Sequence, residues 1–200
     1  VEDDLAGRSH SDGTPFSETL PPRSEVSVPR NCPRCSTDLI VDGAFIRCTN
    51  IECPSRLERG ILYWCRKLGM DGIGEKLAEQ LCSSGLVSSL ADLYRLEDRE
   101  RELIGLERMA QKSASNVLEE LNSTRSMTFS TFISALGLPR IGPEIATLVC
   151  SEVRDLEELI QMTEDREEAV RRLISIDRIG ETVATLLLDG IYERKDSIID

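Results

Sequence analysis

Four cysteines lie close together near the start of the chain, and their spacing is typical of metal ligands. One pair is separated by two residues and the other by four, and the four are Cys32, Cys35, Cys48 and Cys53. Thiolates at this spacing suit Zn²⁺, which favours four soft ligands in a tetrahedron. Because every ligand would be a cysteine, the ion would have no open position for water. The sequence therefore predicts a structural zinc site whose folding depends on the metal.

The segment between the two cysteine pairs predicts a β-hairpin. Asp42 and Gly43 are flanked on both sides by β-forming residues. An Asp-Gly pair in such a place favours a tight turn between two antiparallel strands. The hairpin would return the chain so that the second cysteine pair meets the first. We therefore expect a small zinc-binding unit at residues 31–56.

Three short turns, each leading into an apolar helical segment, have the composition of phosphate-binding loops. Residues 72–74 read Gly-Ile-Gly, whereas 140–142 and 178–180 both read Arg-Ile-Gly. Glycine lets an anion approach the main chain, and the first amides of a helix have no intrahelical partner. We expect each isoleucine to pack inward and a nearby cation to complete the site. The residues predicted to contact phosphate are Gly72, Ile73, Gly74, Lys76, Gly137, Arg140, Ile141, Gly142, Arg178, Ile179 and Gly180.

A single turn of this kind is often only a helix cap, but here the unit repeats. Residues 104–114 occupy the place of a further unit, although its turn reads Arg-Met-Ala at 108–110. Successive units are about 32 to 38 residues apart, a spacing that indicates a tandem array. The array has the pattern of helix-hairpin-helix motifs, which contact the nucleic-acid backbone and not the base edges.

The rest of the chain favours a mainly α fold. Aromatic residues make up only 4%, so the core must consist of Leu, Ile, Val and Ala. Residues 1–30 are rich in Ser, Pro, Asp and Glu and predict a disordered tail or linker. From residue 55 onward, apolar residues recur at helical spacing, which predicts a tandem helix-hairpin-helix bundle at 57–194. The expected helices cover 55–68, 75–84, 98–104, 111–123, 127–136, 143–152, 154–161, 165–175 and 181–194.

The net charge of −12 argues against a general polyanion binder. Any contact with nucleic acid must rest on local backbone donors and a few placed cations.

We expect Cys65, Cys82 and Cys150 to be small buried hydrophobes and His10 to have no role in a site. No apolar run could span a membrane, no secretory signal precedes the cysteines, and disulfides are not expected. The start at Val1 suggests that upstream sequence is missing.

These motifs, in this order, closely resemble the C-terminal half of bacterial NAD-dependent DNA ligase. The resemblance covers residues 31–192 and extends to the segments 92–96 and 112–118. In that family a four-cysteine zinc finger precedes four helix-hairpin-helix motifs that help to encircle nicked duplex DNA. The resemblance implies that Cys32, Cys35, Cys48 and Cys53 bind Zn²⁺. It also implies double-stranded DNA as a sequence-independent partner, in the bacterial cytoplasm at the nucleoid.

Two of the turns depart from the family pattern. The second turn has Arg-Met-Ala at 108–110 where the family usually has Gly-x-Gly, and the fourth begins with Arg178 and not glycine. A turn without glycine is expected to hold a phosphate less closely. We therefore expect the second hairpin to pack structurally without holding phosphate, and the same argument leaves open whether the fourth hairpin holds one.

The catalytic lysine of the family is missing from this chain. Nucleotidyl transfer needs a lysine nucleophile in a Lys-x-Asp-Gly setting. The lysines are Lys67, Lys76, Lys112 and Lys195, and none has that setting. The chain alone should therefore be unable to seal a nick, and NAD would be bound only by a missing upstream domain.

Two functions remain open at this point. The first is the non-catalytic DNA-binding portion of an NAD-dependent DNA ligase, acting in nick joining during replication and repair. The second is a free-standing, degenerate ligase-like module that binds DNA or protein without ligase activity, which the acidic C-terminal half favours. A gene that continues upstream of Val1 into a Lys-x-Asp-Gly domain would indicate the first. A hydrolase or nuclease lacks support, because no His/Asp/Glu cluster has suitable spacing.

Overall fold

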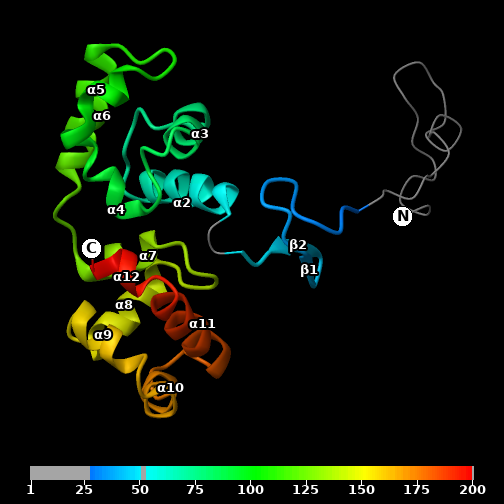
Figure 1. Ribbon diagram of the computed structural model, residues 1–200. Helices are drawn as coiled ribbons and strands as arrows, with labels where there is room; N and C mark the ends of the chain where they lie inside the picture. Colours follow the sequence, from blue (N-terminus) through cyan, green and yellow to red (C-terminus); the bar gives the residue numbers. More distant parts are fainter. Residues whose placement is uncertain (1–27, 51–52, 200) are drawn as a thin grey trace, which may run out of the picture. The chain divides into compact units, whose positions relative to one another are not determined.

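The computed structural model describes residues 28–50 and 53–199 (Figure 1). Most of the predicted tail, residues 1–27, lies outside the described residues. The chain divides into two compact units, with the division after Thr49. The first contains the predicted hairpin and the second contains the helices.

The hairpin consists of β1 (Leu39–Asp42) and β2 (Phe45–Cys48). The strands are antiparallel, with Leu39 opposite Cys48 and Asp42 opposite Phe45. The turn residues are therefore Gly43 and Ala44, one position later than an Asp-Gly turn would place them. Gly43 has a φ of +61°, and glycine at the first position suits a two-residue turn that needs a left-handed residue there. The predicted hairpin is present, with this shift of one residue.

The helical unit contains every predicted helix, and Figure 1 shows α2–α6 and α7–α11 as two neighbouring groups. The elements are α2 (Pro54–Lys67), α3 (Glu75–Ser83), α4 (Leu90–Leu93), η2 (Leu96–Arg99), α5 (Glu100–Ile104), α6 (Gln111–Ser123), α7 (Phe129–Ala135), α8 (Pro143–Glu152), α9 (Leu156–Met162), α10 (Arg166–Ile174), α11 (Glu181–Tyr192) and α12 (Lys195–Ile199). The sequence did not predict α4 or α12. Both are too short to show a helical period in the apolar residues.

One apolar core runs through both groups of helices and consists mainly of Leu, Ile, Val and Ala, as predicted. The single tryptophan, Trp64 on α2, helps to join the groups. Its ring lies edge-to-face against Phe132 of α7, with centroids 5.7 Å apart, and against Tyr94 at 6.4 Å. Its indole nitrogen donates to the Tyr94 hydroxyl at 3.0 Å, so the polar atom of this buried ring has a partner.

The three cysteines outside the zinc motif behave largely as expected. Cys65 is buried, and Cys82 and Cys150 are partly buried against the core. Burial raises the pKa of the Cys65 thiol to about 11, and it raises the pKa of Cys150 to about 11. Both thiols therefore stay protonated at neutral pH and pack as small apolar groups.

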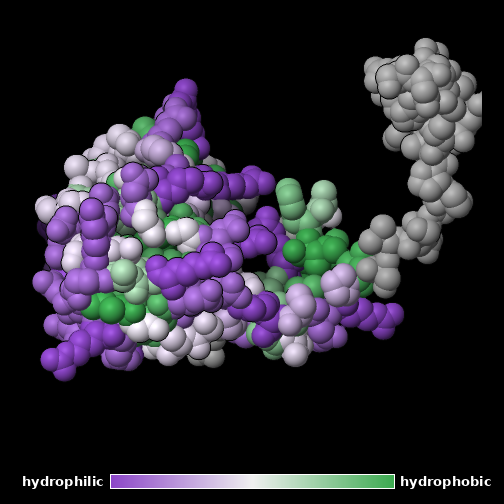
Figure 2. All heavy atoms as spheres, turned by 90° about the horizontal axis from the view of Figure 1, so that it is seen from above, coloured by the Kyte–Doolittle hydropathy of each residue, from purple (hydrophilic) through white to green (hydrophobic). Residues whose placement is uncertain are grey.

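The surface of the helical unit is mostly polar, as the view in Figure 2 shows. The hairpin differs, because Ile40, Val41, Phe45 and Ile46 on it are all exposed. The guanidinium of Arg47 lies 5.5 Å from the centroid of the Phe45 ring. Within the described residues, none of the helices has the length and apolar character that a membrane span requires.

Candidate metal centre and nucleic-acid interface

The four cysteines of the predicted zinc site are brought together. The Sγ atoms of Cys32, Cys35, Cys48 and Cys53 all lie within 4.8 Å of one another. Those of Cys35 and Cys48 are 3.5 Å apart, close to the roughly 3.8 Å between sulfurs around a tetrahedral Zn²⁺ with Zn–S bonds of about 2.3 Å. The donor set and its spacing fit a structural zinc ion.

Local backbone structure presents these thiols. In the first cysteine turn, the amide of Ser36 donates to the Cys32 carbonyl and the Cys32 amide donates to Thr37, both at 2.8 Å. Ser36 adopts a φ of +61°, which closes the turn. The last cysteine, Cys53, is also the N-cap residue of α2, and its carbonyl accepts the Arg56 amide at 2.8 Å. A candidate metal ligand is thus also the N-cap residue of a helix.

The four predicted hairpin turns share one backbone conformation. They directly precede α3, α6, α8 and α11, at residues 72–74, 108–110, 140–142 and 178–180. Each contains one residue in the left-handed region: Gly72 at φ +90°, Arg108 at +62°, Arg140 at +64° and Arg178 at +67°. The second turn therefore has the same backbone geometry as the others, although it lacks glycine. Its expected failure to hold phosphate stays a prediction.

The residue after the left-handed position packs inward in every turn. Ile73, Ile141 and Ile179 are buried, with 7%, 2% and 3% of their surface exposed. Met109 takes the same place in the second turn and packs against the core. The predicted inward position of the three isoleucines is confirmed.

The helices that follow these turns begin differently from several other helices of the molecule. Their N-cap residues are Gly74, Ala110, Gly142 and Gly180, and none provides a side-chain hydrogen bond to the first turn. By contrast, side-chain oxygens cap α4, α7, α9 and α10 at Ser89, Thr128, Asp155 and Asp165. Orphan amides at a helix start, together with the helix dipole, form a site for an anion.

The fold itself does not require glycine at the three N-cap positions. Gly74, Gly142 and Gly180 have φ values of −94°, −90° and −87°, which any residue can adopt. A Cβ atom built on any of them would have nothing within 4 Å. An N-cap side chain commonly lies close to the first amides of its helix, so a larger residue at these positions would stand near those amides. The absence of one leaves room for an external group to approach.

Two other predicted glycines have structural reasons of their own. Gly72 is in the left-handed region and packs near Val117 of α6. Gly137 ends α7 with a φ of +66°, and a Cβ there would lie 2.9 Å from the Tyr63 ring. Gly137 is therefore required by its conformation and by close packing, whether or not it also lies near phosphate.

The hairpins associate in two pairs. Gln80 on α3 accepts the Glu107 amide of the second turn at 2.8 Å, which links the first and second hairpins. In the other pair, Leu138 of the third turn packs on Gly190 of α11, where a Cβ would lie only 2.4 Å from Leu138 Cδ2. The Arg178 side chain of the fourth turn also forms an ion pair with Glu144 on α8.

The four predicted or neighbouring cations differ in their surroundings. Lys76 and Arg140 are exposed, and neither forms an ion pair within residues 28–50 and 53–199. Arg108 lies 3.5 Å from Glu107, and Arg178 is paired with Glu144. Among the described residues, the arginines of the second and fourth turns therefore face carboxylates, whereas Arg140 of the third turn does not.

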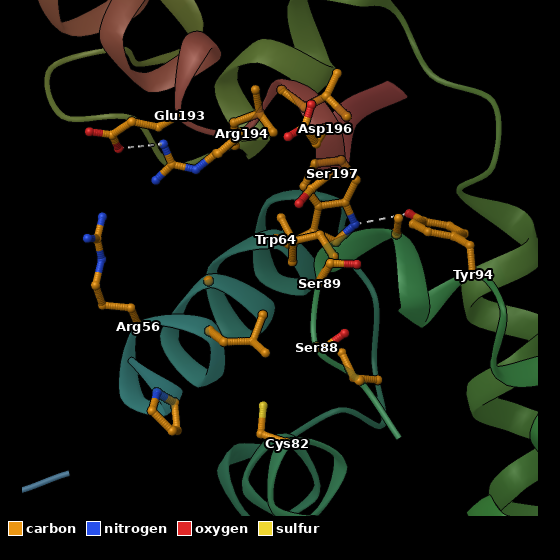
Figure 3. Close-up of a pocket in the computed structure, with 18 of the residues that line it drawn as sticks. Arg56, Trp64, Cys82, Ser88, Ser89, Tyr94, Glu193, Arg194, Asp196 and Ser197 are labelled. Carbon is orange, nitrogen blue, oxygen red and sulfur yellow. Dashed lines mark hydrogen bonds and ion pairs between the residues drawn. The ribbon is translucent and has the colours of Figure 1, made fainter. Parts of the chain in front are cut away.

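A separate cavity of about 760 Å³ lies where the two groups of helices meet (Figure 3). Trp64 and Phe132 supply apolar wall, whereas Arg56, Glu193 and Arg194 supply charge. Burial, together with the nearby Arg56, lowers the pKa of the Arg194 guanidinium, and Glu193 opposes this shift. No predicted phosphate-contact residue lines the cavity. Sequence reasoning missed it because its walls come from segments far apart in the chain.

Beside this cavity lies a polar cluster that the sequence could have indicated. Ser89 and Asp92 form a capping box at α4, and both Ser88 and Ser89 donate to the Asp92 carboxylate at 2.7 to 2.9 Å. Burial acts to raise the pKa of Asp92, but these hydrogen bonds outweigh it and lower that pKa to about 2. A Ser-x-x-Asp spacing is the readable signal for such a box.

Comparison with known proteins agrees with this geometry. Residues 68–123 and 132–191 each match the SAM-like helix-hairpin-helix tandem family. Each matched segment contains one pair of hairpins: the turns at 72–74 and 108–110 lie in the first, and those at 140–142 and 178–180 in the second.

The chain is also similar to proteins called DNA ligase. It is 32% identical to that of Coprothermobacter proteolyticus over 169 residues, which cover 84% of this chain and 24% of the relative. It is 32% identical to that of Methylacidiphilum infernorum, over 92% of this chain and 26% of the relative. For Bacillus velezensis the identity is 31%, over 88% and 25%. The chain thus spans about a quarter of the length of these relatives, and it belongs to the SAM-like helix-hairpin-helix tandem family.

Proposed function

We propose that this chain is the DNA-binding portion of an NAD-dependent DNA ligase, holding duplex DNA by its backbone for nick joining in replication and repair. The observation that carries this proposal is the set of repeated turns whose helices start with uncapped, unobstructed amides. The similarity to DNA ligases supports the identity of the nucleic acid. The bacterial cytoplasm, at the nucleoid, is the location that this function requires.

The contribution of this chain is to bind and orient. Amides at the start of α3 and α8 would donate to phosphate oxygens, while Lys76 and Arg140 add charge beside them. Such contacts carry no sequence information. Nucleotidyl transfer, and the binding of NAD, would belong to the remaining three quarters of a ligase-sized protein. A structural Zn²⁺ held by the four clustered cysteines would stabilise the hairpin.

The charge of the molecule limits the affinity that we expect for duplex DNA. Against a net charge of −12, the cations that would release counterions on binding are Lys76 and Arg140, which lie beside the two helix starts expected to receive phosphate. With about two phosphates neutralised, the logarithm of the binding constant should fall against log salt with a slope of about −2. Binding should therefore be weak and independent of sequence.

The proposal is tested by titrating a fluorescent duplex with Gly74→Val and Gly142→Val variants. Both positions have extended backbone and open space, so valine fits the fold but projects toward the approaching phosphate. Gly60→Val is the matched control, because it makes the same change in open space within α2. We expect each turn variant to weaken binding and the control to bind like wild type. Equal affinity of all four proteins would contradict the proposal.

A free-standing module without ligase activity is the second candidate. It is favoured by the ion pairs that compensate Arg108 and Arg178. The two candidates differ in genetic context, since only the ligase reading requires the open reading frame to continue into a Lys-x-Asp-Gly domain. Sequencing upstream of the codon for Val1 separates them.

A further inference from the structure

The ion pair between Arg178 and Glu144 connects two turns that are 34 residues apart in sequence. Arg178 is the left-handed residue of the fourth turn. Glu144 is the second residue of α8, directly after Pro143, and so lies at the helix start where the third turn would receive its phosphate. Both side chains are mostly exposed, with 63% and 70% of their surface accessible.

Glu144 poses an electrostatic problem for that site. A carboxylate at a helix N-terminus stabilises the helix, because it faces the positive end of the dipole. The same carboxylate repels any phosphate that approaches the same amides. In the third turn Pro143 has no N–H, so the donors that remain include the amide of Glu144 itself. The acid and the expected anion therefore compete for one small region.

The fold holds the fourth turn where it can relieve this repulsion. Gly190 of α11 packs against Leu138 of the third turn, and Arg166 at the start of α10 forms an ion pair with Asp189 of α11. Arg178 itself is held in the left-handed conformation at φ +67°. The Leu138–Gly190 contact joins the third and fourth hairpins, the Arg166–Asp189 pair joins the two helices of the fourth, and Arg178 lies against Glu144 in this arrangement.

We propose that Arg178 is a positioning residue that screens Glu144, so that the third hairpin can hold phosphate. It acts through the carboxylate and does not itself hold DNA. This inference rests on the proposed function and refines it. It also gives the fourth hairpin a role in binding that needs no phosphate of its own.

A double-mutant cycle tests the proposal. Duplex binding is measured for wild type, Glu144→Gln, Arg178→Gln and the double variant, at low and at moderate salt. Loss of Arg178 alone should weaken binding about twofold to fivefold, the range typical of exposed charge interactions. Glu144→Gln should bind at least as tightly as wild type. The double variant should bind like Glu144→Gln, because Arg178 has nothing to screen once the acid is gone.

Two results would overturn the inference. If Arg178→Gln weakens binding equally with and without Glu144, Arg178 contacts phosphate directly. If neither substitution alters affinity or its dependence on salt, the pair has no part in binding. The control is the pair Glu168 and Arg171 on α10, which are 3.0 Å apart and similarly exposed. The corresponding glutamine variants there should leave affinity unchanged.

The results that would refute the screening role of Arg178 differ from those that would refute the proposed DNA-binding function. If the wild-type protein does not bind duplex DNA, or if Gly142→Val binds like wild type, the premise that the third hairpin holds a phosphate is refuted. A protein in which Gly142→Val weakens binding while the Arg178 and Glu144 effects are additive refutes only the screening role. Thermal denaturation of each variant shows that the fold is retained. Glutamine and arginine have the same kind of side chain at Cβ, so the left-handed backbone is expected to tolerate the exchange.

Discussion

At the scale of single residues, three arginines occupy left-handed backbone positions, at Arg108, Arg140 and Arg178. The first hairpin uses Gly72 at the equivalent place. A left-handed conformation costs a non-glycine residue about 1–2 kcal/mol. The surrounding helix pairs must therefore stabilise the turn enough to hold an arginine there, and this conformation was not predicted, because arginine carries no local signal for it.

The second turn gives a test of this conformation that is separate from DNA. Arg108→Val should destabilise the protein by more than about 1 kcal/mol, because a β-branched residue fits the left-handed region poorly. Arg108→Gly should stay within about 1 kcal/mol of wild type, since glycine adopts the conformation freely but makes the unfolded chain more flexible. Urea denaturation measures both. Equal stabilities of the two variants would contradict the assigned backbone.

Asp92 should make the stability of the protein depend on pH in the acid range. Its pKa is lowered to about 2 in the folded protein, against about 3.9 in an unfolded chain. The stabilisation is therefore complete above about pH 4 and is lost as the pH falls toward 2. Asp92→Asn should reduce the free energy of unfolding by about 0.5–2 kcal/mol at pH 7. Urea denaturation at pH 7 and near pH 2 should show that the difference in unfolding free energy between wild type and Asp92→Asn is smaller in acid. A difference that does not change with pH would contradict this account.

At the scale of elements, the hairpins are held in pairs by close packing as well as by the core. Gly190 lies inside α11, where glycine normally weakens a helix. It has a packing reason, because a Cβ there would meet Leu138 Cδ2 at 2.4 Å. The contact seats the third turn on the second helix of the fourth hairpin.

Gly190→Ala should therefore destabilise the protein by about 1–3 kcal/mol, although alanine favours helices. In the Leu138→Ala background the same substitution should be less harmful, because the clashing atoms are gone. Gly60→Ala in α2 is the control and should be neutral or stabilising, since its Cβ meets nothing within 4 Å. Thermal or urea denaturation gives the comparison. Additive effects of Gly190→Ala and Leu138→Ala would show that the two residues do not contact.

If the four clustered cysteines hold Zn²⁺ as proposed, their unit should respond to metal removal separately from the helices. Chelation should unfold the hairpin region, residues 31–54, because two strands with exposed apolar side chains cannot form a stable fold alone. The helical unit has its own core and should keep its far-ultraviolet circular dichroism signal. Cys48→Ser should have the same effect without a chelator. Loss of the helical signal together with the metal would contradict this division.

At the scale of the whole molecule, the features predictable from sequence are those that local rules determine. The cysteine spacing, the hairpin and the helices after the Gly-Ile-Gly and Arg-Ile-Gly turns all follow from short segments. The features that were missed depend on contacts between distant segments. They include the Arg178–Glu144 pair, the cavity beside Trp64 and the packing role of Gly190. Helix α4 was not predicted for another reason: it is too short for its apolar residues to show a helical period.

The two pairs of hairpins repeat one turn conformation, but the charged side chains of the two turns in each pair have different partners. In each pair the cation of the first turn, Lys76 or Arg140, forms no ion pair within the part of the chain that the structure describes. The second turn of each pair keeps the backbone geometry but its arginine faces a carboxylate. We expect the first and third hairpins to hold phosphate and the second and fourth to position them.

The central claim is that the amides at the starts of α3 and α8 receive DNA phosphates. The most direct measurement is the change in backbone amide resonances, by heteronuclear NMR, when a short nicked duplex is added at low salt. The largest shifts should fall on residues 74–76 and 142–145, apart from Pro143, and higher salt should reverse them. Shifts confined to the cavity around Trp64 or to the β-hairpin, with those amides unchanged, would contradict the account.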